Sequence, residues 1–273
     1  MNMMIKNACQ AMNDEGFAGF YDSLASQYAL HGTTTYGEFV QRTDRATLPL
    51  SCQEDAVFYS VAYAMGHYVT FAQVLADNLV LEDADTVMNI VDYGCGQGIA
   101  TLATMAHIAS QRDAGATHLN IHLVEPSTVA LSIARYQVAC MADALGFSVC
   151  ITSQNVPLAQ VVVPDFANDA DTLHLMSYIL DVPAVQVQLG NLTGQIRQLT
   201  GVQWVIASGI NTPAGCAGFN VLSHQLTGCT YDIPKYHVAH RRYDVIHGCY
   251  RTHTSRAIGM AWYSNEATAT KVA

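Results

Sequence analysis

Positive charge is scarce in this chain. Of its 273 residues only 12% are charged, and 22 Asp and Glu outnumber 12 Lys and Arg, which gives a formal net charge of −10. Because binding to a phosphate backbone depends on cations that displace counterions, this balance disfavours nucleic acid and favours a small-molecule or protein substrate. One local exception is the segment 235–242, which gathers five Lys, Arg and His side chains. We interpret it either as a solvated loop or as a contact for an anionic substrate.

Long apolar runs are also missing. No stretch reaches the eighteen or so uninterrupted apolar residues that a bilayer crossing needs, although 51% of the chain is hydrophobic. The first ten residues carry one positive charge, Lys6, and lack the compact apolar run of an export signal. The eight cysteines show no close-paired spacing, which disfavours a disulfide framework. We therefore expect a cytoplasmic protein with reduced thiols and no membrane partner.

The first 84 residues favour helices. Between residues 54 and 80, apolar side chains recur at helical spacing after an acidic first turn. We predict one long amphipathic helix here, bent at Gly66. Residues 1–50 mix glycine, threonine and tyrosine with short helical patterns, such as that over 16–30. Residues 1–84 are therefore expected to form a helical N-terminal cap or lid in front of a second unit over 85–273.

From residue 87 onward, short β-branched or aliphatic runs alternate with helical patterns. The predicted strands cover 87–93, 119–124, 147–152, 172–176 and 202–208, and the predicted helices cover 99–112, 127–145, 183–199 and 213–226. Such alternation is typical of a parallel sheet with helices on both faces. Two further strands, near 243–250 and 258–263, are expected to form a terminal antiparallel hairpin. The predicted fold class is α/β, a doubly wound, mostly parallel sheet of about seven strands with its ligand at the carboxyl ends of the strands.

A glycine-rich turn follows the first predicted strand. Asp92 ends that strand, and Gly94, Gly96 and Gly98 follow at every second position before a helix begins. Glycine tolerates positive φ and lets the backbone approach a ligand closely. In the dinucleotide fingerprint the third glycine falls one position later, where this chain has Ile99, and Asp92 would repel a pyrophosphate. The spacing therefore disfavours a dinucleotide.

At these residues the chain resembles the class I S-adenosylmethionine-dependent methyltransferases, whose first motif is an apolar strand, an acidic residue and Gly-x-Gly-x-Gly. The matching segment is 90–98. The resemblance implies that S-adenosylmethionine is the cofactor, that Gly94, Gly96 and Gly98 face its amino-acid moiety, and that Asp92 holds its ammonium group directly or through water. It also implies that Glu125, at the end of the second strand, accepts hydrogen bonds from both ribose hydroxyls, a task that suits a carboxylate.

At the third strand the chain departs from the family pattern. Many relatives have an acidic residue there for the adenine amino group, whereas this chain offers the amide oxygens of Gln154 and Asn155. The segment 171–181 resembles the fourth-strand motif, so Ser177 and Tyr178 are expected beside the methyl group and the acceptor. It is not of the Asn-Pro-Pro-Tyr type, which disfavours methylation of amide or exocyclic amino nitrogens. His174 alternates into this strand and is interpreted as a packed core histidine.

Methyl transfer is an in-line displacement, so the enzyme mainly aligns the acceptor, and a base is needed only when the acceptor carries a proton. Tyr63 and His67 lie with Tyr59 at helical spacings and are expected to close over the cofactor as a lid; plain core packing is the alternative. Among the C-terminal histidines, His237 and His240 are candidate bases. Their spacing matches no metal-ligand motif, so no metal is expected.

The favoured function is methyl transfer from S-adenosylmethionine to a small molecule. A protein or RNA group is the alternative acceptor, and a non-catalytic sensor or assembly module that binds the cofactor is the alternative from another class. A nucleotide-dependent oxidoreductase is disfavoured by the glycine spacing. The sequence leaves a homodimer open and does not identify the acceptor.

Overall fold

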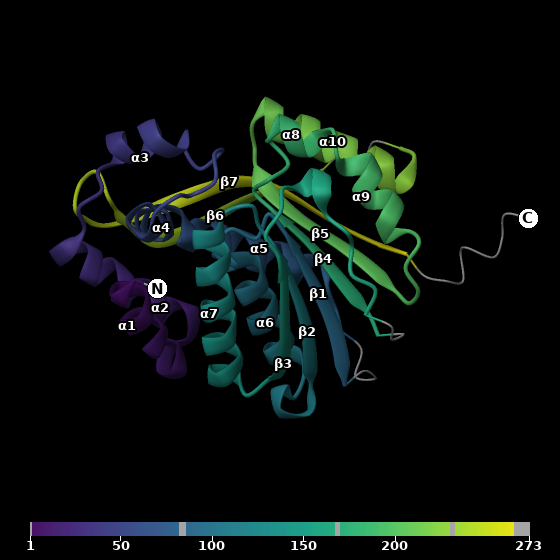
Figure 1. Cartoon of the computed structure of the whole chain (residues 1–273), viewed down its shortest axis with the longest axis horizontal. Helices are drawn as coiled ribbons and strands as arrows, with labels where there is room; N and C mark the ends of the chain where they lie inside the picture. Colours follow the sequence, from purple (N-terminus) through teal and green to yellow (C-terminus); the bar gives the residue numbers. More distant parts are fainter. Residues whose placement is uncertain (1, 82–85, 167–169, 230–232, 265–273) are drawn as a thin grey trace, which may run out of the picture.

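A seven-stranded sheet forms the centre of the molecule (Figure 1). The computed structural model describes residues 2–81, 86–166, 170–229 and 233–264. The sheet has the order β3-β2-β1-β4-β5-β7-β6. Its strands are β1 (Val87–Tyr93), β2 (His118–Val124), β3 (Ser148–Gln154), β4 (Thr172–Ser177), β5 (Gln203–Ile210), β6 (Lys235–Asp244) and β7 (Cys249–Ser264). The first five pair in parallel, and β7 runs antiparallel to both β5 and β6.

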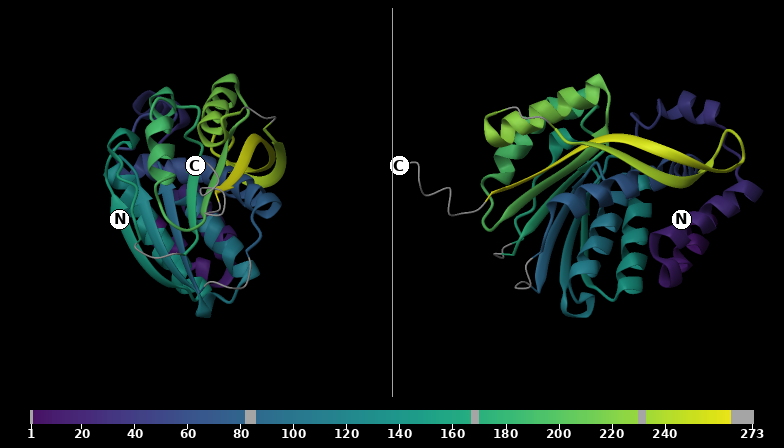
Figure 2. Two further views of the ribbon diagram at one scale, coloured as in Figure 1. Left: turned by 90° about the vertical axis from the view of Figure 1, so that its right-hand side faces the viewer. Right: turned by 180° about the vertical axis from the view of Figure 1, so that it is seen from behind.

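Helices cover both faces of the sheet, as predicted (Figures 1 and 2). One face carries α5 (Met65–Asn78), α6 (Ile99–Gln111) and α7 (Thr128–Leu145), and the other carries α8 (Pro183–Gln186), α9 (Leu189–Ile196) and α10 (Pro213–Thr227). Two short 3-10 turns, Ala114–Ala116 and Leu158–Gln160, lie in the connections. The doubly wound α/β architecture is thereby confirmed. In the described part of the chain, no helix has the length and apolar character to span a membrane.

Alternation along the strands divides the buried side chains into two clusters. In β1, Ile90 belongs to the cluster beneath α6 and α7, whereas Val91 belongs to the cluster beneath α9 and α10. In β5, Ile206 and Val205 divide in the same way. Successive side chains of a strand point to opposite faces, so a strand buried on both sides reads as a continuous apolar run.

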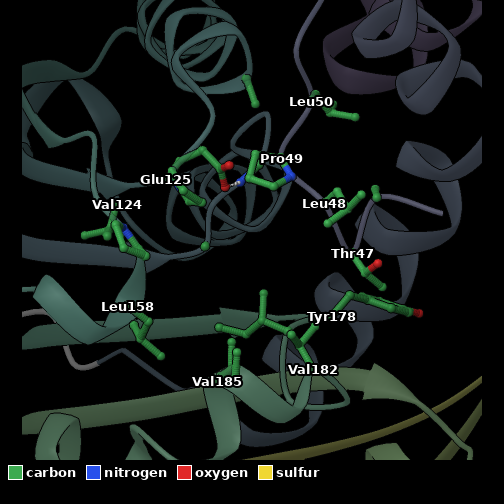
Figure 3. A pocket seen from close by; sticks show the side chains of 18 of the residues that line it. Thr47, Leu48, Pro49, Leu50, Val124, Glu125, Leu158, Tyr178, Val182 and Val185 are labelled. Atoms are coloured by element: carbon green, nitrogen blue, oxygen red, sulfur yellow. Dashed lines mark hydrogen bonds between the residues drawn. The ribbon is translucent and has the colours of Figure 1, made fainter. Parts of the chain in front are cut away.

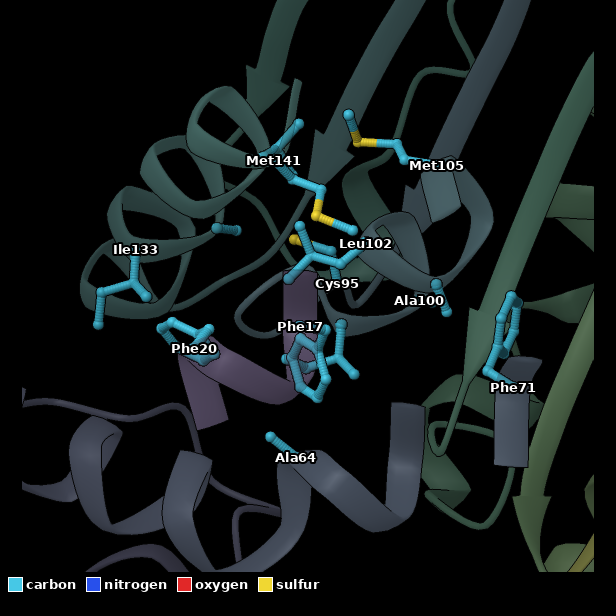
Figure 4. Packing of buried hydrophobic residues seen from close by; sticks show 14 of the residues in the cluster. Phe17, Phe20, Ala64, Phe71, Cys95, Ala100, Leu102, Met105, Ile133 and Met141 are labelled. Atoms are coloured by element: carbon cyan, nitrogen blue, oxygen red, sulfur yellow. The ribbon is translucent and has the colours of Figure 1, made fainter. Parts of the chain in front are cut away.

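The N-terminal segment packs into the first of these clusters. It comprises α1 (Met3–Gln10), α2 (Met12–His31), α3 (Tyr36–Thr43) and α4 (Gln53–Tyr59). Phe17 and Phe20 of α2 belong to the same buried cluster as Leu102 of α6 and Met141 of α7, and all four are almost completely buried (Figure 4). The cap therefore shares a hydrophobic core with the sheet unit, so removing it would expose a large apolar surface.

The long helix predicted over 54–80 is interrupted. It consists of α4, a π-helical turn η1 (Ser60–Ala64), and α5. The irregularity thus lies before Gly66, which is inside α5, and the predicted bend at Gly66 was misplaced. A π turn leaves carbonyls displaced from the regular ladder, and here the hydroxyl of Tyr21 donates to the carbonyl of Val61 at 2.7 Å.

The C-terminal hairpin is antiparallel as expected, and the strand predicted near 258–263 lies within β7, but its first strand lies earlier in the sequence than predicted. Segment 243–250, predicted as a strand, contains the turn between β6 and β7, and Gly248 there has φ +65°. The basic segment 235–242 belongs to β6 and is not a loop, because its side chains alternate and Tyr236 is buried while His237 is exposed. The helix predicted over 183–199 is also divided, into α8 and α9.

Candidate functional site

A cavity of about 350 Å³ opens at the carboxyl ends of β1, β2 and β4 (Figure 3). Gly94 and Gly96 reach it from β1, Glu125 from β2, and Ser177 and Tyr178 from β4. The strand order reverses between β1 and β4, so the cavity lies at the topological switch point, where α/β sheets bind ligands. The sheet topology therefore brings together residues that lie far apart in the sequence.

The three glycines of the turn have three different surroundings. All have positive φ, at +60° for Gly94, +52° for Gly96 and +82° for Gly98. A Cβ on Gly94 would lie 2.9 Å from Ile179, and a Cβ on Gly98 would lie 3.3 Å from Ala134 of α7. A Cβ on Gly96 would meet no protein atom within 4 Å. Gly98 thus permits helix packing, whereas Gly96 leaves open space at the cavity wall.

Glu125 lines the cavity beside the glycine turn and is hydrogen-bonded to it (Figure 3). Its Oε2 accepts the N–H of Gly96 at 2.9 Å, and its Oε1 accepts the N–H of Ser127 at 2.8 Å. Burial raises the pKa of Glu125, and these two backbone hydrogen bonds oppose that rise. Each carboxylate oxygen can accept a second hydrogen bond, so the group is held in place and can still bind two ligand hydroxyls.

Asp92 lies beneath the glycine turn and does not line the cavity. It is 1% exposed, and its Oδ2 accepts the hydroxyl of Thr101 at 2.8 Å, while its Oδ1 is buried with no partner. Burial raises the pKa of Asp92 to about 7, a rise that the hydrogen bonds of Thr101 oppose and the charge of Glu125 increases. A buried carboxylate oxygen without a donor is costly, so a cationic or water ligand beneath the turn would stabilise it.

Gln154 and Asn155 hold the chain around the cavity instead of lining it. The amide of Gln154 forms two hydrogen bonds with the backbone of Val162, at 2.6 and 3.2 Å. Asn155 donates to the carbonyls of Glu125 and Pro126, at 2.8 and 3.0 Å. The expectation that either amide contacts an adenine has no support in this arrangement, because the oxygen of Gln154 accepts the N–H of Val162 and the oxygen of Asn155 accepts the hydroxyl of Thr128.

The cavity wall on that side is apolar. It is formed by side chains from the ends of β2 and β3 and from α8, among them Val124, Val156, Leu158 and Val185 (Figure 3). A slot of this kind suits a flat aromatic group, which is bound by burial of its faces.

A strap formed by residues 44–50 passes the opposite side of the cavity, which its residues 46–50 line (Figure 3). Asp44, Arg45 and Ala46 have φ of 47°, 57° and 68°, so three consecutive non-glycine residues are left-handed. Each such residue costs on the order of 1–2 kcal/mol. The strap is held at its end by the hydroxyl of Ser127, which donates to the carbonyl of Leu50. Sequence reasoning gave the strap no role, because its conformation depends on these tertiary contacts.

Ser177 and Tyr178 lie at the cavity as the fourth-strand motif implied. The two hydroxyls of Ser177 and Ser208 are 3.2 Å apart. Tyr178 has φ +57°, a strained conformation for a residue with a bulky side chain, and its ring stacks on His67 with centroids 3.8 Å apart. Strain of this kind concentrates at functional sites, where the surrounding structure imposes it.

The aromatic residues of the predicted lid do gather at the site. Tyr59 lines the cavity, its ring centroid lies 5.3 Å from that of Tyr63, and its hydroxyl lies 3.4 Å from Nδ1 of His67. Burial, with a smaller effect of the Arg242 charge, lowers the pKa of His67 to about 3. His67 is therefore a neutral ring at physiological pH.

Beyond these rings lies a second cavity of about 500 Å³. Tyr59, Tyr178 and Val182 line both cavities, so the two are neighbours with a common wall. Tyr63, His67 and Asp181 line only the second of them. Asp181 was not singled out in the sequence, although it ends the fourth-strand segment; burial raises its pKa.

His237 and His240 do not line either of these cavities. His237 is exposed and borders a separate shallow depression with Lys235 and Gln73. His240 lies behind α5, where its Nε2 is 3.4 Å from the position of a Cβ on Gly66, and this nitrogen is buried without a partner. The strand they share points them to opposite faces, so they do not act as a pair, and neither has a position from which to serve as the expected base.

His174 is a core histidine, as its position in the strand indicated. It is completely buried, its Nδ1 lies 2.9 Å from the hydroxyl of Tyr93, and its Nε2 lies 2.9 Å from Oε1 of Gln203. Burial lowers its pKa to about 4. Within the described ranges, no three His, Cys, Asp or Glu side chains are grouped so that they could hold a metal ion.

Comparisons with known proteins show likeness of fold. No family model matches the chain, and no curated protein matches it. Among solved structures, a precorrin-6y C5,15-methyltransferase from Geobacter metallireducens GS-15 is 14% identical, with a TM-score of 0.42 over 78% of this chain and 92% of that one. A geranyl diphosphate C-methyltransferase from Streptomyces coelicolor A3(2), in complex with Mg²⁺, geranyl diphosphate and S-adenosyl-L-homocysteine, is 13% identical, with a TM-score of 0.35 over 69% and 76%. At these values the likeness identifies no substrate.

Proposed function

We propose that this protein binds S-adenosylmethionine in the first cavity and transfers its methyl group to a small molecule. The observation that carries the proposal is the pairing of Glu125 with Gly96. A fixed carboxylate and a backbone position without a side chain face the same cavity, 2.9 Å apart through one hydrogen bond. This arrangement suits a ribose beside an amino-acid tail, whereas a diphosphate would meet the buried charge of Glu125 and Asp92.

The residues present fit the cofactor in three respects. The unpartnered Oδ1 of Asp92 beneath the turn suits an ammonium group, directly or through water. The open space at Gly96 suits a closely approaching tail. The apolar wall that includes Val124 and Leu158 suits an adenine ring. When bound, S-adenosylmethionine supplies an electrophilic methyl group on a sulfonium.

The chain's own residues would orient the acceptor and exclude water. Tyr178, with φ +57° and its ring stacked on His67, stands between the two cavities, and its π face favours a cationic neighbour. Asp181 lines the second cavity, and its raised pKa suits a general base that takes a proton from the acceptor. The strap and the aromatic residues of the cap would close the site, since burial from water strengthens these interactions.

Calorimetry of the purified protein with S-adenosylhomocysteine and with NAD tests the cofactor. S-adenosylhomocysteine should bind and NAD should not. Glu125→Gln removes a charged acceptor, so affinity should fall by about tenfold or more, the usual loss for a hydrogen bond to a charged group. Asp14→Asn, an equal charge change at an exposed position of α2, should bind as the wild type does. Tight NAD binding with no response to S-adenosylhomocysteine would remove the proposal.

Turnover separates an enzyme from a non-catalytic module. The protein should transfer a labelled methyl group from S-adenosylmethionine to a component of a small-molecule extract and release S-adenosylhomocysteine. Label in the protein or RNA fraction alone would favour the alternative acceptors. Binding of the cofactor with no transfer to any fraction would favour a sensor or assembly module.

A further inference from the structure

The second cavity carries cationic side chains in a chain that has few of them. Arg45, Arg242 and Arg256 line it, together with Asp44 and Asp181. Arg45 and Arg256 are exposed, whereas Arg242 is half-buried and lines the cavity with Tyr63 and His67. The charge at the inner end of the cavity therefore comes from Arg242.

Arg242 has no carboxylate partner among the described residues. The ion pairs present there join Arg42 to Asp55, and His247 and Arg251 to Asp244. The Nε of Arg242 is buried and makes no hydrogen bond. The charge of a half-buried guanidinium without a carboxylate partner is costly, so an anion that reaches the part of Arg242 lining this cavity would stabilise it.

The π turn fixes the guanidinium at this place. One Nη1 hydrogen bond goes to the carbonyl of Ala62, at 2.5 Å, and Ala62 lies within η1. The rest of the planar group remains for a ligand, and its donors suit a carboxylate or a phosphate in a forked geometry. Burial, and to a smaller extent the charge of Arg242, lowers the pKa of His67 to about 3, so the neighbouring ring is neutral and does not supply a second cation.

The same cavity has flat walls. Tyr63 and His67 lie with ring planes 27° apart and centroids 6.2 Å apart, and the ring of Tyr178 stacks on that of His67 with centroids 3.8 Å apart. Rings of this kind bind planar groups by offset or edge contacts.

From these observations we infer that the acceptor is a small planar molecule that carries a carboxylate or phosphate group, and that Arg242 binds this group. That the bound molecule is the methyl acceptor rests on the proposed function, whereas the anion site itself does not. The planar part would lie along Tyr63 and Tyr178, with its reactive atom towards the wall that the two cavities share. Arg242 is on this view a residue that determines substrate specificity.

Pairs of fragments that differ in charge test the inference. Benzoate and phenyl phosphate are titrated against benzamide and benzyl alcohol, by ligand-observed NMR, with and without S-adenosylhomocysteine. The wild type should bind the anionic members about tenfold more tightly than the neutral ones, the discrimination that a charge-assisted hydrogen bond commonly gives. Arg242→Gln should lose this preference.

Arg241→Gln is the matched control. Arg241 is the neighbour of Arg242 in β6, is exposed, and places its guanidinium 4.2 Å from the centroid of the Tyr250 ring, so its loss should leave the preference unchanged. If Arg242→Gln gives no cooperative thermal transition, Arg242→Lys replaces it, and the preference should fall without vanishing.

Equal binding of anionic and neutral fragments by the wild type, or no binding of either anion, would overturn the inference. A preference that persists unchanged in the Arg242 variants would also overturn it. Because the fragments are titrated on the protein without S-adenosylhomocysteine as well, failure of the cofactor to bind would count against the proposed function alone.

Discussion

Replacing Gly96 by alanine should separate ligand binding from folding. Gly96 has φ +52°, and an added Cβ would meet no protein atom within 4 Å, so the new methyl group would enter the cavity without displacing the chain. The folding penalty is then the left-handed strain alone, about 1 kcal/mol, which in a chain of this size lowers Tm by about 2–4 °C. The same methyl group would occupy space that the ligand needs.

Gly146→Ala is the control for strain. Gly146 ends α7 with φ +84°, and its Cβ would also meet nothing within 4 Å, but it does not line the cavity. Both variants should lose similar thermal stability by calorimetry. Only Gly96→Ala should bind S-adenosylhomocysteine more weakly, by about tenfold or more, equivalent to about 1.4 kcal/mol.

Two results would refute this reasoning. Wild-type affinity in Gly96→Ala would mean that the ligand does not approach the turn. Equal weakening in Gly146→Ala would mean that general strain, and not space at Gly96, controls binding.

Three further predictions concern buried groups near the site. The pKa of Asp92 rises from 3.8 to about 7 in the folded protein, so the unfolded state ionises first and the free energy of unfolding of the wild type should fall as pH rises from 3.8 to about 7. Urea denaturation of Asp92→Asn should lack this pH-dependent fall. The same slope of stability against pH in both proteins would contradict the prediction. The pKa of His67 falls from 6.5 to about 3, so its contribution to stability should be lost as pH falls from 6.5 towards 3. The stability of His67→Phe, measured by urea denaturation, should therefore fall less in acid than that of the wild type. An equal fall would contradict the burial of His67 as a neutral ring. Gln97 is buried and donates to the carbonyl of Ala56, so Gln97→Ala should lower the free energy of unfolding by about 1–3 kcal/mol. Gln73→Ala, at an exposed position, should change it little. Equal effects of the two substitutions would show that the link between the cap and the glycine turn is weak.

The cap contributes to the site through that link. The side chain of Gln97, in the glycine turn, bonds the carbonyl of Ala56 at 2.7 Å and also accepts the hydroxyl of Ser60. Ala56 belongs to α4, which ends at Tyr59, and Ser60 begins the π turn η1 that follows it. A change in the turn on ligand binding would therefore reach the helix that carries Tyr59 directly.

The sequence by itself determined the elements whose causes are local. The β-branched runs and helical periods located β1, β2, β4 and β5 almost to the residue, because each is a continuous pattern buried on two faces or one. The glycine spacing likewise pointed to the cavity at Gly94 and Gly96, and the strand-end positions pointed to Glu125, Ser177 and Tyr178.

Only the tertiary structure decided which polar groups remain available to a ligand. Gln154 and Asn155 had suitable chemistry, yet their amides are bound to the backbone of Val162 and of Glu125, respectively, in the same chain. His237 had suitable chemistry as well, yet strand alternation directs it to solvent. Arg242 stands in a run that by itself indicates either a solvated loop or a contact for an anionic substrate. The tertiary structure places it in β6, where the π turn holds its guanidinium and its Nε has no partner. Availability depends on partners distant in the sequence, so no local pattern can reveal it.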